Sequence, residues 1–201
     1  MAFLSRAGAS REGKFVPDRI DKSLLILGLL LYLAGQIWIN ITGSMTKDQI
    51  AIDGIHWLLL IGAALMIPFA ARLPRNGVGL LAGPLLLVGI VLIIGMNVLD
   101  FVLWSFPASP LRDQVVNELI ATPAVWSPFM VFSGWVFTPA LALASFTYWR
   151  SSRVGPLLAV AGMISIGAFP IWSNPYGYAM IVAGFTFCFR AASQGPSTRN
   201  S

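Results

Sequence analysis

The sequence predicts an all-α integral membrane protein with six transmembrane helices packed in one bundle. Two observations lead to this prediction. Of the 201 residues, 57% are hydrophobic and only 10% are charged, whereas soluble domains carry about 25% charged residues. The hydrophobic residues are also gathered in long runs, which is typical of helices that cross a bilayer.

The clearest run extends from Val78 to Phe106 and contains one charged residue, Asp100. At ~1.5 Å rise per residue, a helix of this length exceeds the ~30 Å hydrocarbon core of a bilayer. Small residues mark close helix contacts and polar residues avoid lipid, so the side that carries both is expected to face other helices. This side contains Gly79, Gly83, Gly89, Asn97, Asp100 and Trp104.

Five further apolar runs complete the predicted bundle. We expect these helices at about 24–41, 55–71, 128–149, 154–172 and 178–192. Residues 42–54 are predicted to form a polar connection, and Asn174-Pro175-Tyr176-Gly177 has the composition of a turn. Residues 1–23 are then a basic N-terminal segment, 24–192 the single transmembrane domain, and 193–201 a polar tail.

A short helix is predicted over residues 109–121, between the third and fourth transmembrane helices. Ser109 suits its N-cap, Pro110 suits its first turn and Pro123 ends it. Its apolar residues form a stripe, which contains Leu111, Val115, Val116, Leu119 and Ile120. Such a helix can lie flat at the membrane interface or serve as a plain connector, and the sequence leaves both open.

The basic residues orient this bundle in the membrane. In the six-helix arrangement, eleven of the 13 lysines and arginines fall on one side, and only Lys47 and Arg112 fall on the other. The positive-inside rule therefore places both termini in the cytoplasm. We expect a multi-pass protein of the cell membrane, most simply the plasma membrane.

This orientation places most polar and aromatic residues of the helices in the outer half of the membrane. They predict a polar cavity with aromatic walls that opens to the extracytoplasmic side. The predicted ligand-binding residues are Gln36, Asn40, His56, Asn97, Asp100 and Trp104. Because an unpaired carboxylate inside a membrane is costly, we further expect Asp100 to have His56 as a neighbour, directly or through one water.

A purely structural explanation exists for several of these residues. Tryptophan and tyrosine belts anchor helices at the interface without binding a ligand. Gln36, Asn40 and Asn97 can serve to hydrogen-bond neighbouring helices. Asp100 lies near the end of its helix, so its carboxylate can also reach the interface.

Composition excludes several function classes. The chain has one cysteine and one histidine, so an intrachain disulfide, a Cys-rich metal site and a haem with two histidine ligands are excluded. No lysine lies inside a predicted helix, which excludes a retinal Schiff base. Asp53, His56 and Asp100 are a weak set of metal ligands. We predict no metal, no cofactor, no catalytic residue and no nucleic-acid binding, and no motif identifies a family.

Three functions remain compatible with the sequence. The first is a non-enzymatic accessory or sensory protein that binds a lipid-like ligand or a membrane-protein partner in the outer cavity. The second is a small transporter that can work as a homodimer, in which the Gly-x-x-x-Gly of Gly79 and Gly83 permits movement or dimer packing. The third is a membrane enzyme that uses His56 and a carboxylate. The apolar cytoplasmic halves of the helices disfavour a transport path, so the first is preferred.

Overall fold

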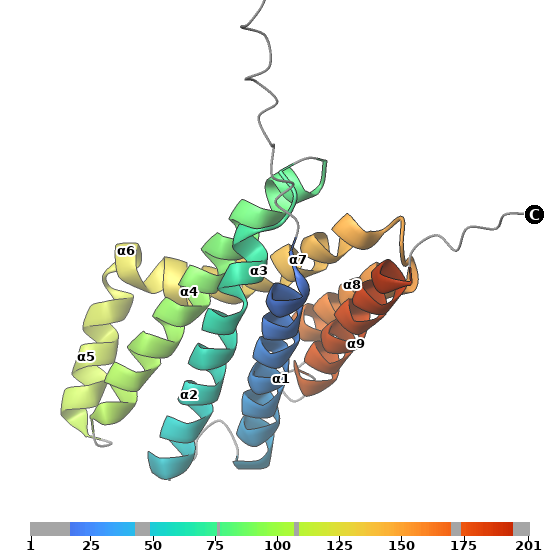
Figure 1. The fold of residues 1–201 in the computed structure, drawn as a ribbon. Coiled ribbons are helices and arrows are strands. Elements are labelled where there is room, and N and C mark those ends of the chain that lie inside the picture. The colour runs from blue at the N-terminus through green and yellow to red at the C-terminus, as the bar shows by residue number, and fades with distance from the viewer. Residues whose placement is uncertain (1–16, 43–48, 76, 107–108, 170–173, 195–201) are drawn as a thin grey trace, which may run out of the picture.

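The computed structural model describes residues 17–42, 49–75, 77–106, 109–169 and 174–194, and these are helical apart from short turns and ends, with no strand among them (Figure 1). The elements in order are α1 (Arg19–Thr42), α2 (Gln49–Leu65), α3 (Ile67–Ala71), α4 (Gly79–Ser105), α5 (Pro110–Ile120), α6 (Pro123–Trp126), the π-helical turn η1 (Ser127–Val131), α7 (Phe132–Ser145), the 3₁₀ turn η2 (Phe146–Tyr148), α8 (Val154–Ala168) and α9 (Asn174–Ser193).

Four helical stretches of the described chain are long and apolar enough to cross a membrane. They are Arg19–Thr42, Gln49–Ala71, Gly79–Ser105 and Pro123–Tyr148. The prediction of an all-α membrane protein is confirmed at this level. The helix α8 is apolar as well, but its described length is 15 residues.

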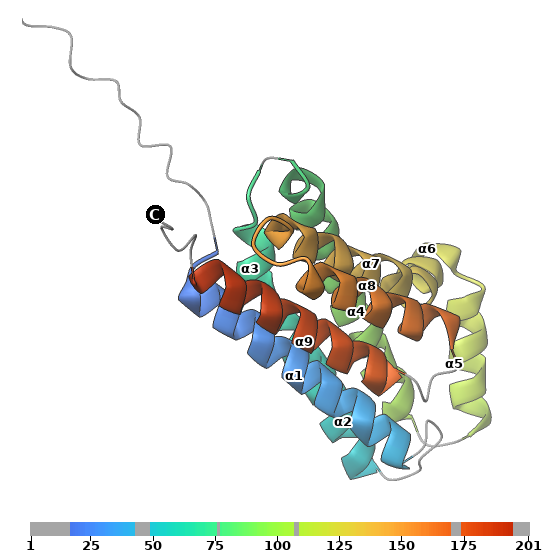
Figure 2. The same cartoon turned by 90° about the vertical axis from the view of Figure 1, so that its right-hand side faces the viewer.

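The six long helices form a closed ring. Around it, α1 packs on α2, α2 on α4, α4 on α7, α7 on α8, α8 on α9, and α9 on α1. Figure 2 shows α9 lying between α1 and α8. The start of α1, the end of α9 and α3 are at the same end of the bundle (Figure 1). The ring closes around a core rich in aromatic residues, including Tyr32, Phe69, Phe137, Tyr178 and Phe185.

Glycines allow neighbouring helices of this ring to approach closely. A Cβ atom at Gly28 of α1 would lie 2.5 Å from the carbonyl oxygen of Gly62 of α2, and a Cβ at Gly177 of α9 would lie 2.7 Å from that of Gly162 of α8. A larger residue at either position would force the two backbones apart. These are the small-residue contacts expected between membrane helices.

The first helix begins at Arg19, five residues before the predicted start at residue 24. The backbone N–H of Asp18 donates to Oδ2 of Asp21, and the backbone N–H of Asp21 donates to Oδ1 of Asp18, both at 2.9 Å. This reciprocal arrangement is a capping box, which satisfies two amide groups that the helix start would leave unpaired. The basic segment 1–23 therefore gives its last residues to the helix.

The predicted polar connection 42–54 is wrong at its second half, because α2 begins at Gln49. The amide of Gln49 donates to Oδ1 of Asp53 at 2.7 Å, one helical turn further on. Such an i,i+4 pair supports an exposed first turn. His56 therefore lies about two turns inside the helix. The predicted start at residue 55 had placed it in the first turn.

The predicted turn at 174–177 is also wrong, because Asn174 to Gly177 form the first turn of α9. Proline is well suited to the first helical turn, since no intrahelical partner exists for its missing N–H. The helix at the other side of this connection, α8, ends at Ala168, and Phe169 has extended backbone angles. The predicted end of that helix at residue 172 lies outside the described residues.

The fourth predicted membrane helix is longer than expected, since the helical rod from α6 to η2 begins at Pro123 rather than at residue 128. Before it, α5 has the predicted bounds and cap: the Ser109 side chain accepts the backbone N–H of Arg112 at 3.5 Å. No residue of α5 is buried. The predicted short helix is therefore present.

The chain itself covers the Gly-x-x-x-Gly face of Gly79 and Gly83. Both glycines are buried, and a Cβ atom at either would meet the chain's own backbone, at the carbonyl oxygens of Pro74 and Ala70 respectively. The segment after α3 therefore covers this Gly-x-x-x-Gly face. No second copy of the chain can use it without unpacking α3 from α4.

Candidate functional site

The expected contact between His56 and Asp100 is confirmed. Nε2 of His56 lies 3.5 Å from Oδ2 of Asp100, which joins α2 to α4. The two residues lie at similar depth, because His56 is seven residues from the start of α2 and Asp100 is five from the end of α4. At ~1.5 Å per residue, both are roughly 8–10 Å from a helix end. The histidine and carboxylate side chains are 12% and 24% exposed.

The other ring nitrogen of His56 fixes how protons can be arranged in this pair. Nδ1 lies 2.7 Å from the backbone carbonyl oxygen of Ile52. A carbonyl only accepts, so Nδ1 carries a hydrogen, and a neutral ring then presents a lone pair at Nε2. A lone pair facing an ionised carboxylate is repulsive, so the pair is stable only when one proton lies on either Nε2 or Asp100. The geometry is that of a one-proton site.

Aromatic side chains cover the pair on one side. The Phe101 ring, next to Asp100 in sequence, lies 5.2 Å from the His56 ring and 5.4 Å from the Trp57 ring, centroid to centroid. Trp57 itself is 54% exposed. Aromatic rings therefore lie beside the imidazole of His56.

Asn97 lies one helical turn from Asp100 and is completely buried. Its Nδ2 donates to the backbone carbonyl oxygen of Ile93 at 2.8 Å, and this contact fixes the orientation of the amide. Its Oδ1 is left as the one buried side-chain nitrogen or oxygen atom of the described residues without a hydrogen-bond partner. A buried acceptor without a donor is costly, so this atom is able to accept a hydrogen bond from a ligand or a water.

The remaining predicted site residues serve in part to hold helices together. Oε1 of the buried Gln36 accepts from Nδ2 of Asn174 at 3.4 Å, which joins α1 to α9. Asn40 is exposed, and its amide donates to the backbone oxygen of Gln36 at 3.0 Å. Trp104 lies under the guanidinium of Arg112, 5.0 Å from its ring centroid, and so anchors α5 to α4. The contact of Gln36 agrees with the structural alternative, whereas the hydrogen bond of Asn40 lies within α1.

A buried tyrosine pair on the same two helices was not predicted. Tyr32 of α1 and Tyr178 of α9 have ring centroids 4.8 Å apart, and their hydroxyl groups are hydrogen-bonded to each other. Tyrosine hydroxyls that are buried usually find such a partner. The available signal was one tyrosine in each of two predicted helices, which does not indicate that the two side chains meet.

A second polar cluster, also missed, lies at the opposite end of the bundle. Nη1 of Arg72, after α3, lies 2.7 Å and 2.9 Å from the two carboxylate oxygens of Asp21 and 3.4 Å from Oδ2 of Asp18. The hydrogen bond that Arg72 donates to the Asp21 carboxylate raises the pKa of the guanidinium still further above its ordinary range, so this charge is permanent. The available signal was the pair of acids three residues apart before the first apolar run.

The three residues weighed as metal ligands do not form a centre. Within the described ranges, no group of three His, Cys, Asp or Glu side chains is close enough to hold a metal ion. Asp53 is paired with Gln49 instead of joining His56 and Asp100. The cysteine, Cys188, is buried in α9.

The chemistry of the His56–Asp100 site is inferred from its geometry alone. No protein-family model matches the chain, and neither a curated protein nor a solved structure matches it.

Proposed function

We propose that the protein is a non-enzymatic sensory or accessory protein of the cell membrane, and that His56 and Asp100 form its sensing site. The proposed topology has six spans, with α8 and α9 as the fifth and sixth, and both termini in the cytoplasm. The sorting of basic residues supports this topology. So does the closed ring, in which α8 and α9 take the same part as the four longer helices. In this topology α5 lies along the outer interface.

The observation that carries the proposal is the one-proton geometry of the His56–Asp100 pair. With the proton present, α2 and α4 are joined by an ion pair or a hydrogen bond. Without it, a carboxylate faces a lone pair, and the repulsion favours separation of the two helices. The other titratable groups that act on these two residues electrostatically are Asp53 of α2 and Tyr32 of α1. The distance between α2 and α4 would thus depend on whether the His56–Asp100 pair holds its proton.

A lipid-like ligand or a partner helix is the natural second input. The exposed Trp57 and the aromatic wall of Phe101 offer apolar contact, while the unpaired Oδ1 of Asn97 offers an acceptor at a nearby depth. A ligand with one hydroxyl or amide donor and an apolar body has the chemistry to match both. Such a ligand would bind preferentially to one protonation state of the pair.

The first experiment uses the fact that the chain has a single histidine. Protein labelled with ¹⁵N-histidine in lipid nanodiscs gives one Nδ1 and one Nε2 resonance. We expect Nδ1 to stay protonated across the titration, and the Nε2 midpoint to move in Asp100→Asn. Asp113→Asn, which removes an exposed carboxylate of α5, is the matched control and should leave the midpoint unchanged. An Nε2 midpoint equal in wild type and Asp100→Asn rules out the proposed pair.

The second experiment measures the proposed response. Spin labels at Ile50 and Ser105, both exposed near the outer ends of α2 and α4, report the distance between these ends in a Cys188→Ser background. We expect the distance to increase when the pH is raised through the titration in the wild type, and to lose this dependence in Asp100→Asn. A distance that does not change with pH in the wild type contradicts the sensory role.

The transporter alternative is supported by one specific observation, the Arg72–Asp21 contact, which closes the inner end between α1 and α3. Alternating access requires contacts that close the path at each side of the membrane in turn. The His56–Asp100 pair would be the outer contact and the Arg72–Asp21 ion pair the inner one. Proteoliposomes loaded with a pH-sensitive dye test this directly. Proton entry that depends on Asp100 would replace the sensory proposal with a transporter.

The close His56–Asp100 pair favours the enzyme alternative. Among the described residues, however, no hydroxyl or thiol group is hydrogen-bonded to His56 as a nucleophile would be. Ser133, a buried serine that contacts α4, donates its hydroxyl to the sulfur of Met96 at 3.4 Å and not to His56. Nδ1 of His56 is already committed to Ile52. A non-enzymatic role therefore remains the proposal that the geometry supports best.

A further inference from the structure

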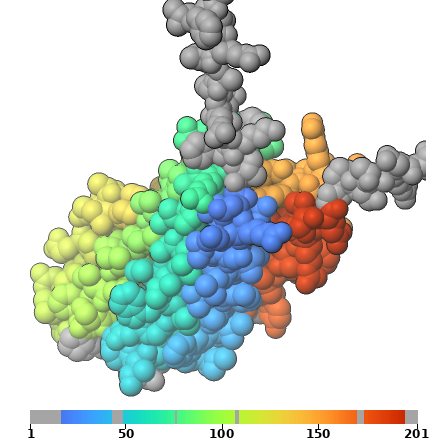
Figure 3. All heavy atoms as spheres, in the orientation of Figure 1, coloured from blue at the N-terminus to red at the C-terminus, as the bar shows by residue number. Residues whose placement is uncertain are grey.

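A groove with a volume of about 620 Å³ runs along the outside of the bundle between α1 and α9. This volume is in the range of small-molecule binding sites, roughly 300–1,000 Å³. Figure 3 shows α1, in blue, and α9, in red, side by side on one face of the molecule. Leu27 and Leu30 in the groove are 47% and 45% exposed, so the groove opens toward the surroundings of the bundle.

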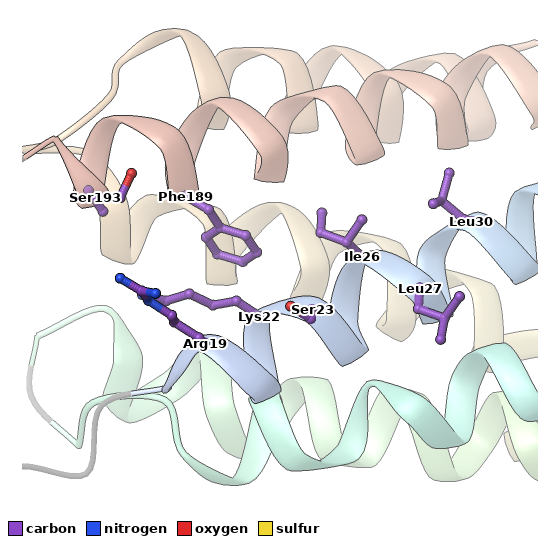
Figure 4. Close-up of a pocket in the computed structure, with 9 residues that line it drawn as sticks. Arg19, Lys22, Ser23, Ile26, Leu27, Leu30, Phe189 and Ser193 are labelled. Carbon is purple, nitrogen blue, oxygen red and sulfur yellow. The ribbon is translucent and has the colours of Figure 1, made fainter.

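The groove changes from charged to apolar along α1. Arg19, Lys22 and Ser23 line its start, and Ile26, Leu27 and Leu30 line its continuation (Figure 4). From residue 19 to residue 30 the helix rises ~16 Å, which is about half of the ~30 Å hydrocarbon core. In the proposed topology the groove therefore extends from the level of the lipid headgroups toward the middle of the bilayer. This is the polarity profile of a phospholipid.

The two cations in the groove are not neutralised by the acids beside them in sequence. Among the described residues, no ion pair includes Arg19 or Lys22, whereas Asp18 and Asp21 both pair with Arg72. Asp21 and Arg72 lie on the α3 side of α1, and the groove lies on its α9 side. The first turn of α1 thus separates its charges, with acids toward α3 and bases toward α9. A positive patch remains where an anion can reach it.

Aromatic rings hold one of these cations in place. Nζ of Lys22 lies 5.8 Å from the ring centroid of Phe189 in α9 and 5.9 Å from that of Tyr148. Figure 4 shows Phe189 projecting from α9 toward α1, with Lys22 and Arg19 at the same end of the groove. A partly buried ammonium group that is held by rings and lacks a counter-ion is well placed to bind a phosphate.

We propose that this groove binds one acidic phospholipid of the cytoplasmic leaflet. Its phosphate lies between Arg19 and Lys22, and one of its acyl chains lies along Ile26, Leu27 and Leu30. The choice of leaflet rests on the proposed topology, in which the start of α1 is cytoplasmic, and acidic lipids are concentrated on that side. Binding itself depends only on the groove.

The helix start does not explain this site by itself. The amide groups of Asp18 and Asp21 at the start of α1 are satisfied by the capping box, so the side chains of Arg19 and Lys22 must supply the binding. A soluble phosphate would use only these two cations. A lipid would use the apolar part of the groove as well, which distinguishes the two sources.

The test uses full-length protein, delipidated in a neutral detergent and titrated with phosphatidylglycerol, with bound lipid measured by native mass spectrometry. We expect one tight site for phosphatidylglycerol and none for phosphatidylcholine or glycerol phosphate. The Arg19→Gln/Lys22→Gln double variant should weaken binding by roughly 20-fold or more, since each cation near an anionic lipid contributes about a fivefold effect. The matched control, Arg150→Gln/Arg153→Gln, removes two exposed cations outside the groove and should bind as the wild type does.

Three results would overturn the proposal. They are equal affinity for phosphatidylglycerol and phosphatidylcholine, equal loss in the two double variants, and binding of glycerol phosphate as tight as that of the lipid. Equal circular dichroism spectra of both variants confirm that folding is not the cause of a loss. Lipid binding measured in detergent does not depend on the orientation of the protein in a membrane or on His56. A negative result in this experiment is therefore separate from a failure of the proposed sensory function.

Discussion

Asp21 and Arg72 join the first turn of α1 to the end of α3, with one guanidinium nitrogen 2.7 Å and 2.9 Å from the two carboxylate oxygens. The Asp21 side chain is 2% exposed and the Arg72 side chain is 48% exposed. A buried carboxylate without such a partner would be strongly unfavourable, so the contact determines where α3 can lie. Through α3, it also positions the cover over Gly79 and Gly83 of α4.

Replacement of Asp21 by alanine should destabilise the bundle. The change removes the acceptor for Arg72 and for the backbone N–H of Asp18, and a lost buried hydrogen-bond partner costs roughly 1–3 kcal/mol. Thermal unfolding in detergent measures the effect, with Asp113→Ala in the exposed α5 as the control. The double variant Asp21→Ala/Arg72→Ala should lose less than the sum of the two single variants. Additive losses would show that the two residues do not act as a pair.

Asp18 should make the bundle sensitive to acid. The backbone N–H of Asp21, and more weakly the charge of Arg72, hold the pKa of the Asp18 carboxyl below its ordinary value of 3.8. The folded pKa is lower than the unfolded pKa, so the stabilisation is complete above about pH 4 and is lost as the pH falls through the folded pKa. Asp18→Asn keeps an oxygen that can cap the helix but has no charge. Its unfolding midpoint should lie below that of the wild type at about pH 6, and the two should converge as the pH falls below about 4 and through the folded pKa of Asp18.

Convergence is the diagnostic part of this experiment. A difference between wild type and Asp18→Asn that stays constant over the same pH range would mean that the carboxylate charge of Asp18 contributes nothing. The remaining difference would then arise from the shape of the cap alone.

Much of the fold could be predicted from hydrophobic periodicity and turn chemistry. The run from Val78 to Phe106 gave α4 to within one residue at each end, and Ser109 gave the start of α5. The contact between His56 and Asp100 could also be predicted, because both residues belong to the same half of two antiparallel helices that follow one another as predicted membrane spans. Depth in the membrane is a strong constraint that sequence order supplies directly.

Contacts between helices distant in sequence could not be predicted in the same way. Gln36 meets Asn174, and Tyr32 meets Tyr178, because α9 closes the ring against α1, and no local pattern encodes this closure. The Arg72–Asp21 pair was hidden for a related reason. The positive-inside rule uses every arginine only as a marker of the cytoplasmic side, whereas Arg72 forms an ion pair with Asp21.

The proposed topology predicts opposite labelling of two positions that lie outside the described residues. In a Cys188→Ser background, a cysteine at Lys47 should react with a membrane-impermeant reagent from outside, and a cysteine at Ser197 only after permeabilisation. The reason is that an odd number of spans separates the two positions in the six-span arrangement. Labelling of both from the same side would require an even number and would refute the arrangement.

Replacement of Asn97 by leucine should stabilise the protein. Asn97 is completely buried, and no described group donates to its Oδ1, so the residue carries an uncompensated cost of burial. Leucine has the same branched arrangement of side-chain heavy atoms and removes that cost, which is roughly 1–3 kcal/mol for an unsatisfied buried group. Reversible unfolding in mixed micelles measures the change, and Asn117→Leu in the exposed α5 should stay within about 0.5 kcal/mol of the wild type. A loss of stability in Asn97→Leu would instead reveal a bound donor at Oδ1, such as an ordered water beside Asp100.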